Sequence, residues 1–242
     1  MKRILILQLC LCLAWTVRAQ LHLDANLSNN HLWRGMEVAD GLVLTSDVTY
    51  TTLDGHLTLG VWGGTNTQGT YKEFNHHLSF QAGGFQLAFW DTYNFSPGAT
   101  YNNKEYFDYN ARTTGRFLDV TASYRFDCKF PLLLSWSTVI FGRDRNVANT
   151  ENKYSTFVYA EYPVCEKDVW RLDVGVGGAF ALNRAGDSSH FFGTTEGIVH
   201  TMLKLTRKVS IGKWTFPIYA QALWNPQSDK GFLQMGAKLF SF

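Results

Sequence analysis

Alternation of apolar and polar side chains along most of the chain is the feature that constrains its fold most. Successive side chains of a β-strand point to opposite faces, so a strand with one apolar face repeats with a period of two. After Trp15, no segment approaches the roughly 20 uninterrupted apolar residues of a membrane-spanning helix. The alternation recurs at 21–27, 57–61, 85–89, 118–126, 132–136, 172–176 and 199–205. The chain is therefore predicted to consist of strands.

The composition agrees with strands that face lipid. Charged residues make up 17% of the chain and aromatic residues 15%, whereas about 25% of a typical soluble domain is charged. We therefore predict an all-β, antiparallel, up-and-down transmembrane β-barrel of about 12 strands, whose length of about 10 to 13 residues suits a tilted crossing of a roughly 25 Å apolar band. A soluble β-sandwich is the alternative, because it also has short alternating strands.

The predicted connections alternate between short and long. Bacterial outer-membrane barrels have short turns on the periplasmic side and longer loops outside. Short turns are expected at 53–55, 82–84, 127–130 and 165–168, and longer polar loops at 35–41, 65–69, 96–103, 143–152, 183–194 and 225–230. The run Arg143-Asp144-Arg145 opens one of the long loops and is predicted to be solvated and internally paired.

The first residues have the three parts of an export signal. Lys2 and Arg3 form a charged head, 4–15 is mainly apolar, and 17–19 ends in a small residue, as a cleavage site does. The apolar stretch of about 12 residues is too short for a spanning helix. We predict a signal peptide at 1–19, a barrel over 20–242, and a location in the outer membrane of a Gram-negative cell.

Without this signal, the chain is close to electrically neutral. The 22 basic residues include three in the signal, which leaves 19 against 20 acidic residues. Nucleic-acid-binding domains instead concentrate basic charge on one face. The sequence therefore predicts no nucleic-acid partner, and it contains no phosphate-binding glycine loop, zinc-binding cysteine set or dinucleotide fingerprint that would indicate a cofactor.

The C-terminal strand ends in Phe240-Ser241-Phe242. A terminal aromatic residue resembles the signal by which barrel-assembly machinery recognises its clients. Leu233, Met235, Ala237 and Leu239 lie in the opposite phase to Phe240 and Phe242. A β-bulge near the terminus, which adds one residue to a strand, would reconcile the two phases.

Cys128 and Cys165 are the only cysteines that follow the signal segment. Both fall in predicted short turns on the periplasmic side, which is an oxidising compartment. The pair is a disulfide candidate, and two free thiols are the alternative, because the geometry that a disulfide requires is not determined by the sequence.

If the apolar phase faces lipid, the opposite phase lines the interior. The lumen-lining candidates are Asp47, Glu73, His77, Asp119, Arg125, Glu161, Arg171, Asp173 and Lys204. Their signs are mixed, whereas a strongly selective pore shows a ring of one sign. The interior is therefore expected to be either weakly selective or closed by ion pairs. Trp62, Trp90 and Tyr159 share this phase and are expected to fill a narrow barrel; guidance of a sugar or aromatic solute is the alternative role.

Several segments in the first third of the chain resemble a known family. The run Ser28-Asn29-Asn30-His31-Leu32-Trp33-Arg34-Gly35, followed by Asp40-Gly41, resembles the first strand and loop of the TorF-like porins. Gly60-Val61-Trp62-Gly63-Gly64 and Tyr71-Lys72-Glu73-Phe74 resemble the next hairpin of that family. The resemblance implies an outer-membrane β-barrel of porin-like character.

An enzymatic alternative rests on His77, Ser79 and Asp91. This set resembles the catalytic residues of barrel lipid hydrolases, the outer-membrane phospholipase A and lipid A deacylase families. Residues i and i+2 of a strand share a face, so His77 is placed to activate Ser79. Asp91, however, is in phase with the apolar residues of its strand. The three residues are therefore predicted to be split between two faces, and we expect no enzyme.

The leading functional prediction is porin-like passive diffusion of small polar solutes through a narrow lumen. The rival prediction is a non-conducting barrel with a structural or partner-binding role. The expected partners are outer-membrane lipid and lipopolysaccharide, the barrel-assembly machinery through the C-terminal strand, and small polar solutes. No cofactor and no metal site are indicated.

Overall fold

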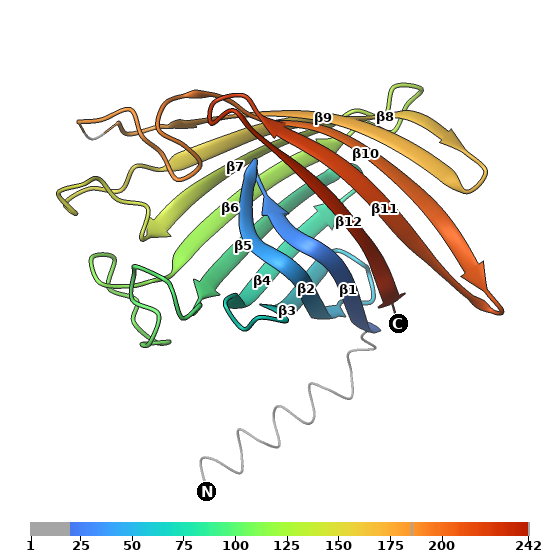
Figure 1. The fold of residues 1–242 in the computed structure, drawn as a ribbon, viewed down its shortest axis with the longest axis horizontal. Coiled ribbons are helices and arrows are strands. Elements are labelled where there is room, and N and C mark those ends of the chain that lie inside the picture. The colour runs from blue at the N-terminus through green and yellow to red at the C-terminus, as the bar shows by residue number, and fades with distance from the viewer. Residues whose placement is uncertain (1–19, 185, 242) are drawn as a thin grey trace, which may run out of the picture.

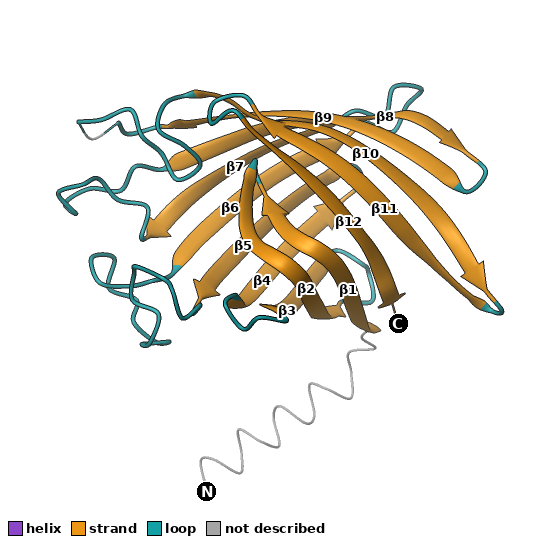
Figure 2. Ribbon diagram, viewed as in Figure 1, coloured by secondary structure: helices purple, strands orange, loops and turns teal. Residues whose placement is uncertain are grey.

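The computed structural model describes residues 20–184 and 186–241, so the predicted signal peptide and Phe242 lie outside the described residues. The described residues form twelve strands and no helix (Figure 2). The strands are β1 (Gln20–Trp33), β2 (Met36–Thr51), β3 (Leu57–Asn66), β4 (Lys72–Ala82), β5 (Phe85–Asn94), β6 (Phe117–Arg125), β7 (Leu133–Gly142), β8 (Ser155–Lys167), β9 (Trp170–Ala181), β10 (Gly197–Ile211), β11 (Trp214–Asn225) and β12 (Lys230–Ser241).

The strands form one closed barrel. Each strand pairs antiparallel with its neighbours in the sequence, and β1 pairs with β12 to close the sheet (Figure 1). The predicted fold class, an up-and-down antiparallel barrel of about 12 strands, is confirmed, and the sandwich alternative is wrong because a sandwich has two open sheets. No helix in the described part of the chain is long and apolar enough to span a membrane.

The two faces of the wall differ in polarity as the alternation predicts. Exposed apolar side chains cover the outside, including Leu59, Phe80, Phe89, Trp136, Val176, Leu203, Leu205, Trp224 and Leu233. The opposite phase carries buried polar side chains, including Asn75, Thr92, Asp119, Ser137, Asp173 and Gln234. The long connections β5–β6, β7–β8 and β9–β10 gather at one end, on the left of Figure 1. The turns β8–β9 and β10–β11 and the C-terminus lie at the other end.

The predicted long loop at 35–41 is wrong, because β1 and β2 continue into a tight hairpin. β1 pairs with β12 only through Asp24–Ser28, and β2 pairs with β3 only from Val43 onward. Between these points, residues 30–40 pair with one another, and the Leu42 carbonyl accepts a hydrogen bond from the Thr67 N–H at 2.9 Å. Residues 29–42, here called the inner hairpin, leave the wall and enter the barrel. Figure 1 shows the blue hairpin bending away from β12.

The C-terminal strand contains the predicted bulge. Ala25 pairs with Phe240 and Asn26 pairs with Lys238, so Leu239 is the extra residue. The bulge shifts the phase by one residue. As a result, Phe240 lies on the same outer face as Leu233 and Met235.

Two predicted connections differ from those observed. Cys165 lies within β8 rather than in a turn, and the turn that follows contains only Asp168 and Val169. The β5–β6 connection spans 95–116 instead of 96–103. Its later part has no regular alternation and forms turns held by Asp108 and Asn110, whose side chains accept hydrogen bonds from nearby backbone N–H groups.

Candidate functional site

The inner hairpin leaves the wall where the side chains of Asn29 and Gln234 replace the backbone hydrogen bonds of strand pairing. The amide of Asn29 donates a hydrogen bond to the Leu233 carbonyl (3.1 Å) and accepts one from the Met235 N–H (2.6 Å). The Gln234 amide donates to the Asn30 carbonyl at 2.8 Å. A buried or half-buried backbone group needs such a partner. The edge of β12 is therefore satisfied at this point although its neighbouring strand has turned inward.

The tip of the inner hairpin is a two-residue turn at Arg34-Gly35. Both residues have positive φ, 45° for Arg34 and 86° for Gly35, as a type I′ hairpin turn requires. A Cβ on Gly35 would lie 2.0 Å from the Val199 carbonyl oxygen. The Asn225 amide donates a hydrogen bond to the Gly35 carbonyl at 3.0 Å. The tip is thus pressed against β10 and the end of β11, where only glycine fits.

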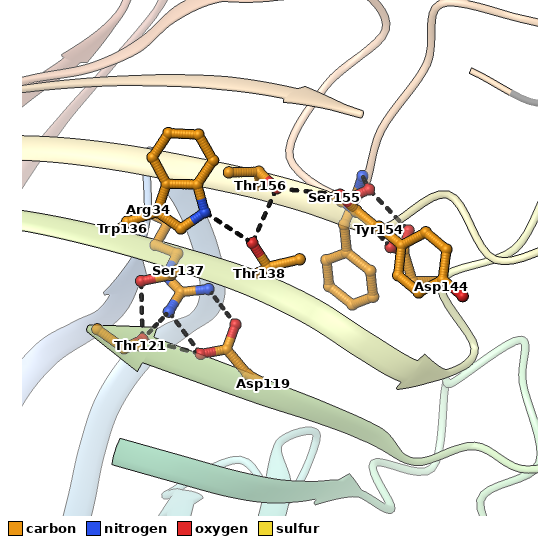
Figure 3. A network of polar contacts seen from close by, with 11 residues as sticks. Arg34, Asp119, Thr121, Trp136, Ser137, Thr138, Asp144, Tyr154, Ser155 and Thr156 are labelled. Carbon is orange, nitrogen blue, oxygen red and sulfur yellow. Dashed lines mark hydrogen bonds and ion pairs between the residues drawn. The ribbon is translucent and has the colours of Figure 1, made fainter. Parts of the chain in front are cut away.

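Arg34 also joins the tip to the far wall. Its guanidinium donates to both carboxylate oxygens of Asp119 on β6, at 2.6 and 2.8 Å, and to Thr121 at 3.2 Å (Figure 3). Thr121 in turn donates to Ser137 on β7 at 2.7 Å. The Arg34 side chain is 14% exposed and the Asp119 side chain 4%. A two-pronged, buried pair of this kind is among the stronger polar contacts in proteins.

Aromatic rings surround this ion pair. Trp33 contacts Phe117 on β6 and Phe192 in the β9–β10 loop, with ring centroids 5.7 and 5.3 Å apart. The Arg34 guanidinium lies 4.8 Å from the Trp33 ring centroid and 5.5 Å from that of Phe192. These rings shield the pair from water and add cation–π attraction. The tip of the inner hairpin is therefore fixed between opposite walls of the barrel.

A cavity of about 740 Å³ lies inside the barrel, between the inner hairpin and the wall. Small-molecule sites commonly have volumes of about 300 to 1,000 Å³. The hairpin contributes one side of the cavity and strands β3 to β6 contribute the other. Residues of the long loops, such as Tyr101, Arg143 and Phe191, complete the lining. Its lining includes His31, Trp33, Arg34, Glu37, Trp62, Glu73, Trp90, Tyr101, Phe117, Asp119, Arg143 and Phe191.

The β9–β10 loop contributes Phe191 to the cavity lining and Phe192 to the ring contacts of Trp33. Its Asp187 pairs with Lys153, and hydrogen bonds from Lys153 and Ser189 lower the pKa of this aspartate to about 2. Burial lowers the pKa of His190 below its usual value. His190 Nδ1 accepts the Phe192 N–H at 3.2 Å, and Nε2 lies 2.7 Å from the Thr195 carbonyl. A neutral imidazole therefore orders the loop that carries Phe192.

The predicted lumen-lining residues fall into two groups. Glu73 and Asp119 line the cavity, as do Trp62 and Trp90. The others form contacts outside the cavity lining: His77 with Asp47 (2.9 Å), Arg125 with Glu161 (3.2 Å), Arg171 with Asp173 (2.9 Å), and Lys204 with the Tyr219 ring (4.7 Å). Tyr159 donates a hydrogen bond to Glu161 at 3.1 Å. Arg125 and Arg171 are thereby paired with carboxylates of opposite charge.

The residues of the hydrolase alternative lie apart. His77 bonds to Asp47 and stacks on Trp90 with ring centroids 4.3 Å apart, and within the described residues no hydrogen bond joins it to Ser79. Asp91 instead accepts hydrogen bonds from Arg116 (2.7 Å) and Tyr109 (2.7 Å) of the β5–β6 loop. Asp91 is on the opposite face of the sheet, as its phase predicts.

The predicted disulfide is not formed in the structure, where Cys128 and Cys165 are free, exposed thiols. Cys128 lies in the β6–β7 turn. Its sulfur instead contacts Phe130, with the thiol 3.2 Å from the Phe130 carbonyl oxygen.

Sequence reasoning missed both arginines of the cavity, Arg34 and Arg143. Arg34 is absent from the lumen-lining candidates, but it lies at a hairpin turn inside the barrel. The run Arg143-Asp144-Arg145 is not internally paired: Asp144 is buried and accepts hydrogen bonds from the Ser155 N–H and hydroxyl at 2.7 Å, and Arg145 binds Asn149 and Asn152. Arg143 turns toward the cavity. The sequence offers no signal for this position, because β7 ends in the apolar run Val139-Ile140-Phe141 and a charge after a strand is typical of a solvated loop.

The fold and interior together define a closed β-barrel with an apolar outer face and an interior cavity lined by charged and aromatic side chains. No family model matches the sequence, and no curated protein matches it. Among solved structures, the chain is similar to an outer membrane channel from Pseudomonas putida F1, with 11% sequence identity, coverage of 92% of this chain and 93% of that chain, and a TM-score of 0.41. At this identity and score, the likeness assigns no role to any residue of this chain.

Proposed function

We propose that the protein is an outer-membrane channel through which small polar solutes diffuse down their concentration gradients. The observation that carries the proposal is the cavity of about 740 Å³ inside the closed barrel. The apolar outer face supports a location in lipid, because lipid-facing and lumen-facing residues alternate in membrane barrels. The signal peptide, the lipid and lipopolysaccharide contacts, assembly through the C-terminal strand and the TorF-like porin character belong to the same proposal.

The inner hairpin sets the width of the proposed passage. A solute entering from the loop end meets the Arg34–Asp119 pair and must pass between the hairpin and the wall formed by β3 to β6. Further along the interior, positive and negative side chains alternate in contacts with one another. Since a strongly selective pore has a ring of one sign, this arrangement supports weak selection by charge and stronger selection by size.

Single-channel recording of the refolded protein in a planar bilayer tests this function. We expect small, discrete and reproducible conductance steps, with a reversal potential near zero in a salt gradient because charge selection is weak. Steps that also appear in bilayers treated with heat-unfolded protein would contradict the proposal.

A non-conducting barrel with a binding role is the second candidate. The crossing of the barrel by the inner hairpin, with its tip bonded to Asp119 and packed against β10, favours it. A silent bilayer, with folded protein verified by heat-modifiable mobility on gels, would support this candidate over the channel. No enzymatic activity is proposed, and hydrolysis of phospholipid by the wild type that is lost in Ser79→Ala would overturn that view.

A further inference from the structure

Arg143 is a cation on the cavity wall that lies near the carboxylates of Glu73 and Asp144 without forming an ion pair with either. Its Nε atom is buried and donates no hydrogen bond. Within the described residues, no carboxylate lies within ion-pair distance of its guanidinium. The other arginine of the cavity, Arg34, is engaged with both oxygens of Asp119. Arg143 is therefore the cavity cation whose donors are open to an anion.

Aromatic rings hold this guanidinium in place. Its central carbon lies 3.9 Å from the Tyr101 ring centroid, 4.8 Å from that of Phe191 and 5.2 Å from that of Phe117. A cation–π contact uses the faces of the rings and leaves the N–H donors of the arginine unused. A planar guanidinium with free donors matches a carboxylate, which it binds through two parallel hydrogen bonds.

The rest of the cavity is suited to a flat, apolar body. Trp33, Trp62 and Trp90 contribute indole rings to the lining. Glu73 faces the same cavity, and its carboxylate accepts hydrogen bonds from the amides of Asn75 (2.8 Å) and Asn94 (3.1 Å) instead of an ion pair. A second negative charge on a ligand would be repelled by Glu73, which favours a monoanion.

We propose that this cavity binds small organic monocarboxylates that carry a flat ring, with the carboxylate on Arg143 and the ring among the tryptophans. The site deepens the channel function proposed above and rests on it for the route by which the solute arrives. Binding itself is measurable without any flux across a membrane.

Titration calorimetry on the detergent-solubilised, folded barrel tests the site with benzoate as the probe. Benzamide is its neutral counterpart, and acetate has the charge without the ring. We expect benzoate to bind and both analogues to bind at least about tenfold more weakly, because charge-assisted hydrogen bonds and ring contacts each contribute on the order of one factor of ten. Phthalate, a dianion, is expected to bind more weakly than benzoate.

Variants assign the binding to Arg143. Arg143→Gln is expected to weaken benzoate binding roughly tenfold to a hundredfold, and Arg143→Lys to restore part of it. Glu73→Gln is expected to tighten binding because it removes a repelling charge. Arg112→Gln is the matched control, since it removes the same charge from an exposed loop position outside the cavity lining.

The outcomes separate this site from the channel. Absence of benzoate binding, or binding that Arg143→Gln leaves unchanged, would overturn the site even if the wild type conducts. Benzoate binding that depends on Arg143 in a barrel without conductance would support the site and overturn the channel. A variant that loses heat-modifiable folding is replaced by Arg143→Lys, whose binding relative to the wild type then decides.

Discussion

The β1–β2 hairpin has two parts that are held in different ways, one by backbone pairing with neighbouring strands and the other by side-chain contacts. Residues 24–28 and 43–51 belong to the wall, where they pair with each other and with β12 and β3, respectively, on their other sides. The inner hairpin, residues 29–42, has its internal ladder and is fixed to the rest of the barrel mainly by side chains such as Asn29, Arg34 and Asn225. A wall strand cannot move without breaking its ladder, whereas the inner hairpin can be released by removing a few contacts.

Removal of the Arg34 side chain is expected to have the largest effect on this difference. Arg34→Ala leaves the buried Asp119 carboxylate without its partner, at a cost of about 3 to 5 kcal/mol to the docked state. The tip should then leave the far wall, so single-channel conductance should rise severalfold. Arg171→Ala, which removes a cation from an interior ion pair of the wall, is the control. Equal conductance of Arg34→Ala and the wild type would show that the hairpin does not limit the passage.

Gly35→Ala tests the contact of the tip with β10. The new Cβ would lie 2.0 Å from the Val199 carbonyl, and we expect the tip to be displaced, with destabilisation of the docked hairpin by about 1 to 3 kcal/mol. Gly55→Ala is a matched control, because Gly55 has a similar positive φ of 74° with nothing within 4 Å of the added atom. Hydrogen exchange at residues 30–39 should increase in Gly35→Ala alone. If both variants behave alike, backbone strain and not the close approach is responsible.

Asn29→Ala is expected to act at the point of departure from the wall. Loss of the side chain removes two hydrogen bonds to β12, at about 0.5 to 1.5 kcal/mol each. Exchange at the Met235 amide should accelerate, while the tip stays docked. Asn26→Ala, on the wall half of the same strand, is the control. An unchanged Met235 exchange rate would mean that this amide is protected by something other than Asn29.

Acidification is expected to give the smallest effect. Because burial lowers the pKa of His190, its contribution to loop stability is complete above the unfolded value of about 6.5 and is lost as the pH falls through the lower folded pKa. Protonation also removes the acceptor for the Phe192 N–H. Channel noise should therefore increase below about pH 6 in the wild type and should lose this pH dependence in His190→Gln. Persistence of the pH dependence in the variant would assign it to another group.

The barrel was largely predictable from the sequence because apolar and polar residues alternate along the strand segments of its wall. Alternation at Leu57, Leu59 and Val61 places one face toward the outside, and the structure has these residues exposed. The bulge beside Leu239 was also predictable, since two phases cannot share one regular strand. The inner hairpin was not, because the same period-two pattern runs through a wall strand and through a strand that has left the wall.

The candidate site was predicted less well than the fold. The phase of the alternation alone placed four of its residues in the interior: Glu73, Asp119, Trp62 and Trp90. Arg34 did not, because type I′ turns favour Asn, Asp or Gly at the first position, and an arginine there gives no turn signal. Arg143 was missed because a charged run in a loop is usually solvated, and only the fold of the neighbouring aromatic rings places it at the cavity.

The short seam between β1 and β12 has a consequence for biogenesis. Only five residue pairs, Asp24–Ser28 against residues 236–241, close the described barrel, and they join segments more than 200 positions apart in the chain. Distant pairing is the slowest to form, because chain entropy must be lost before any contact is gained. Because the pairing between β1 and β12 is short, few contacts must be aligned at once. The bulge at Leu239 fits only one register of β12 against β1. Closure of the cylinder is therefore expected to be the final step of its assembly.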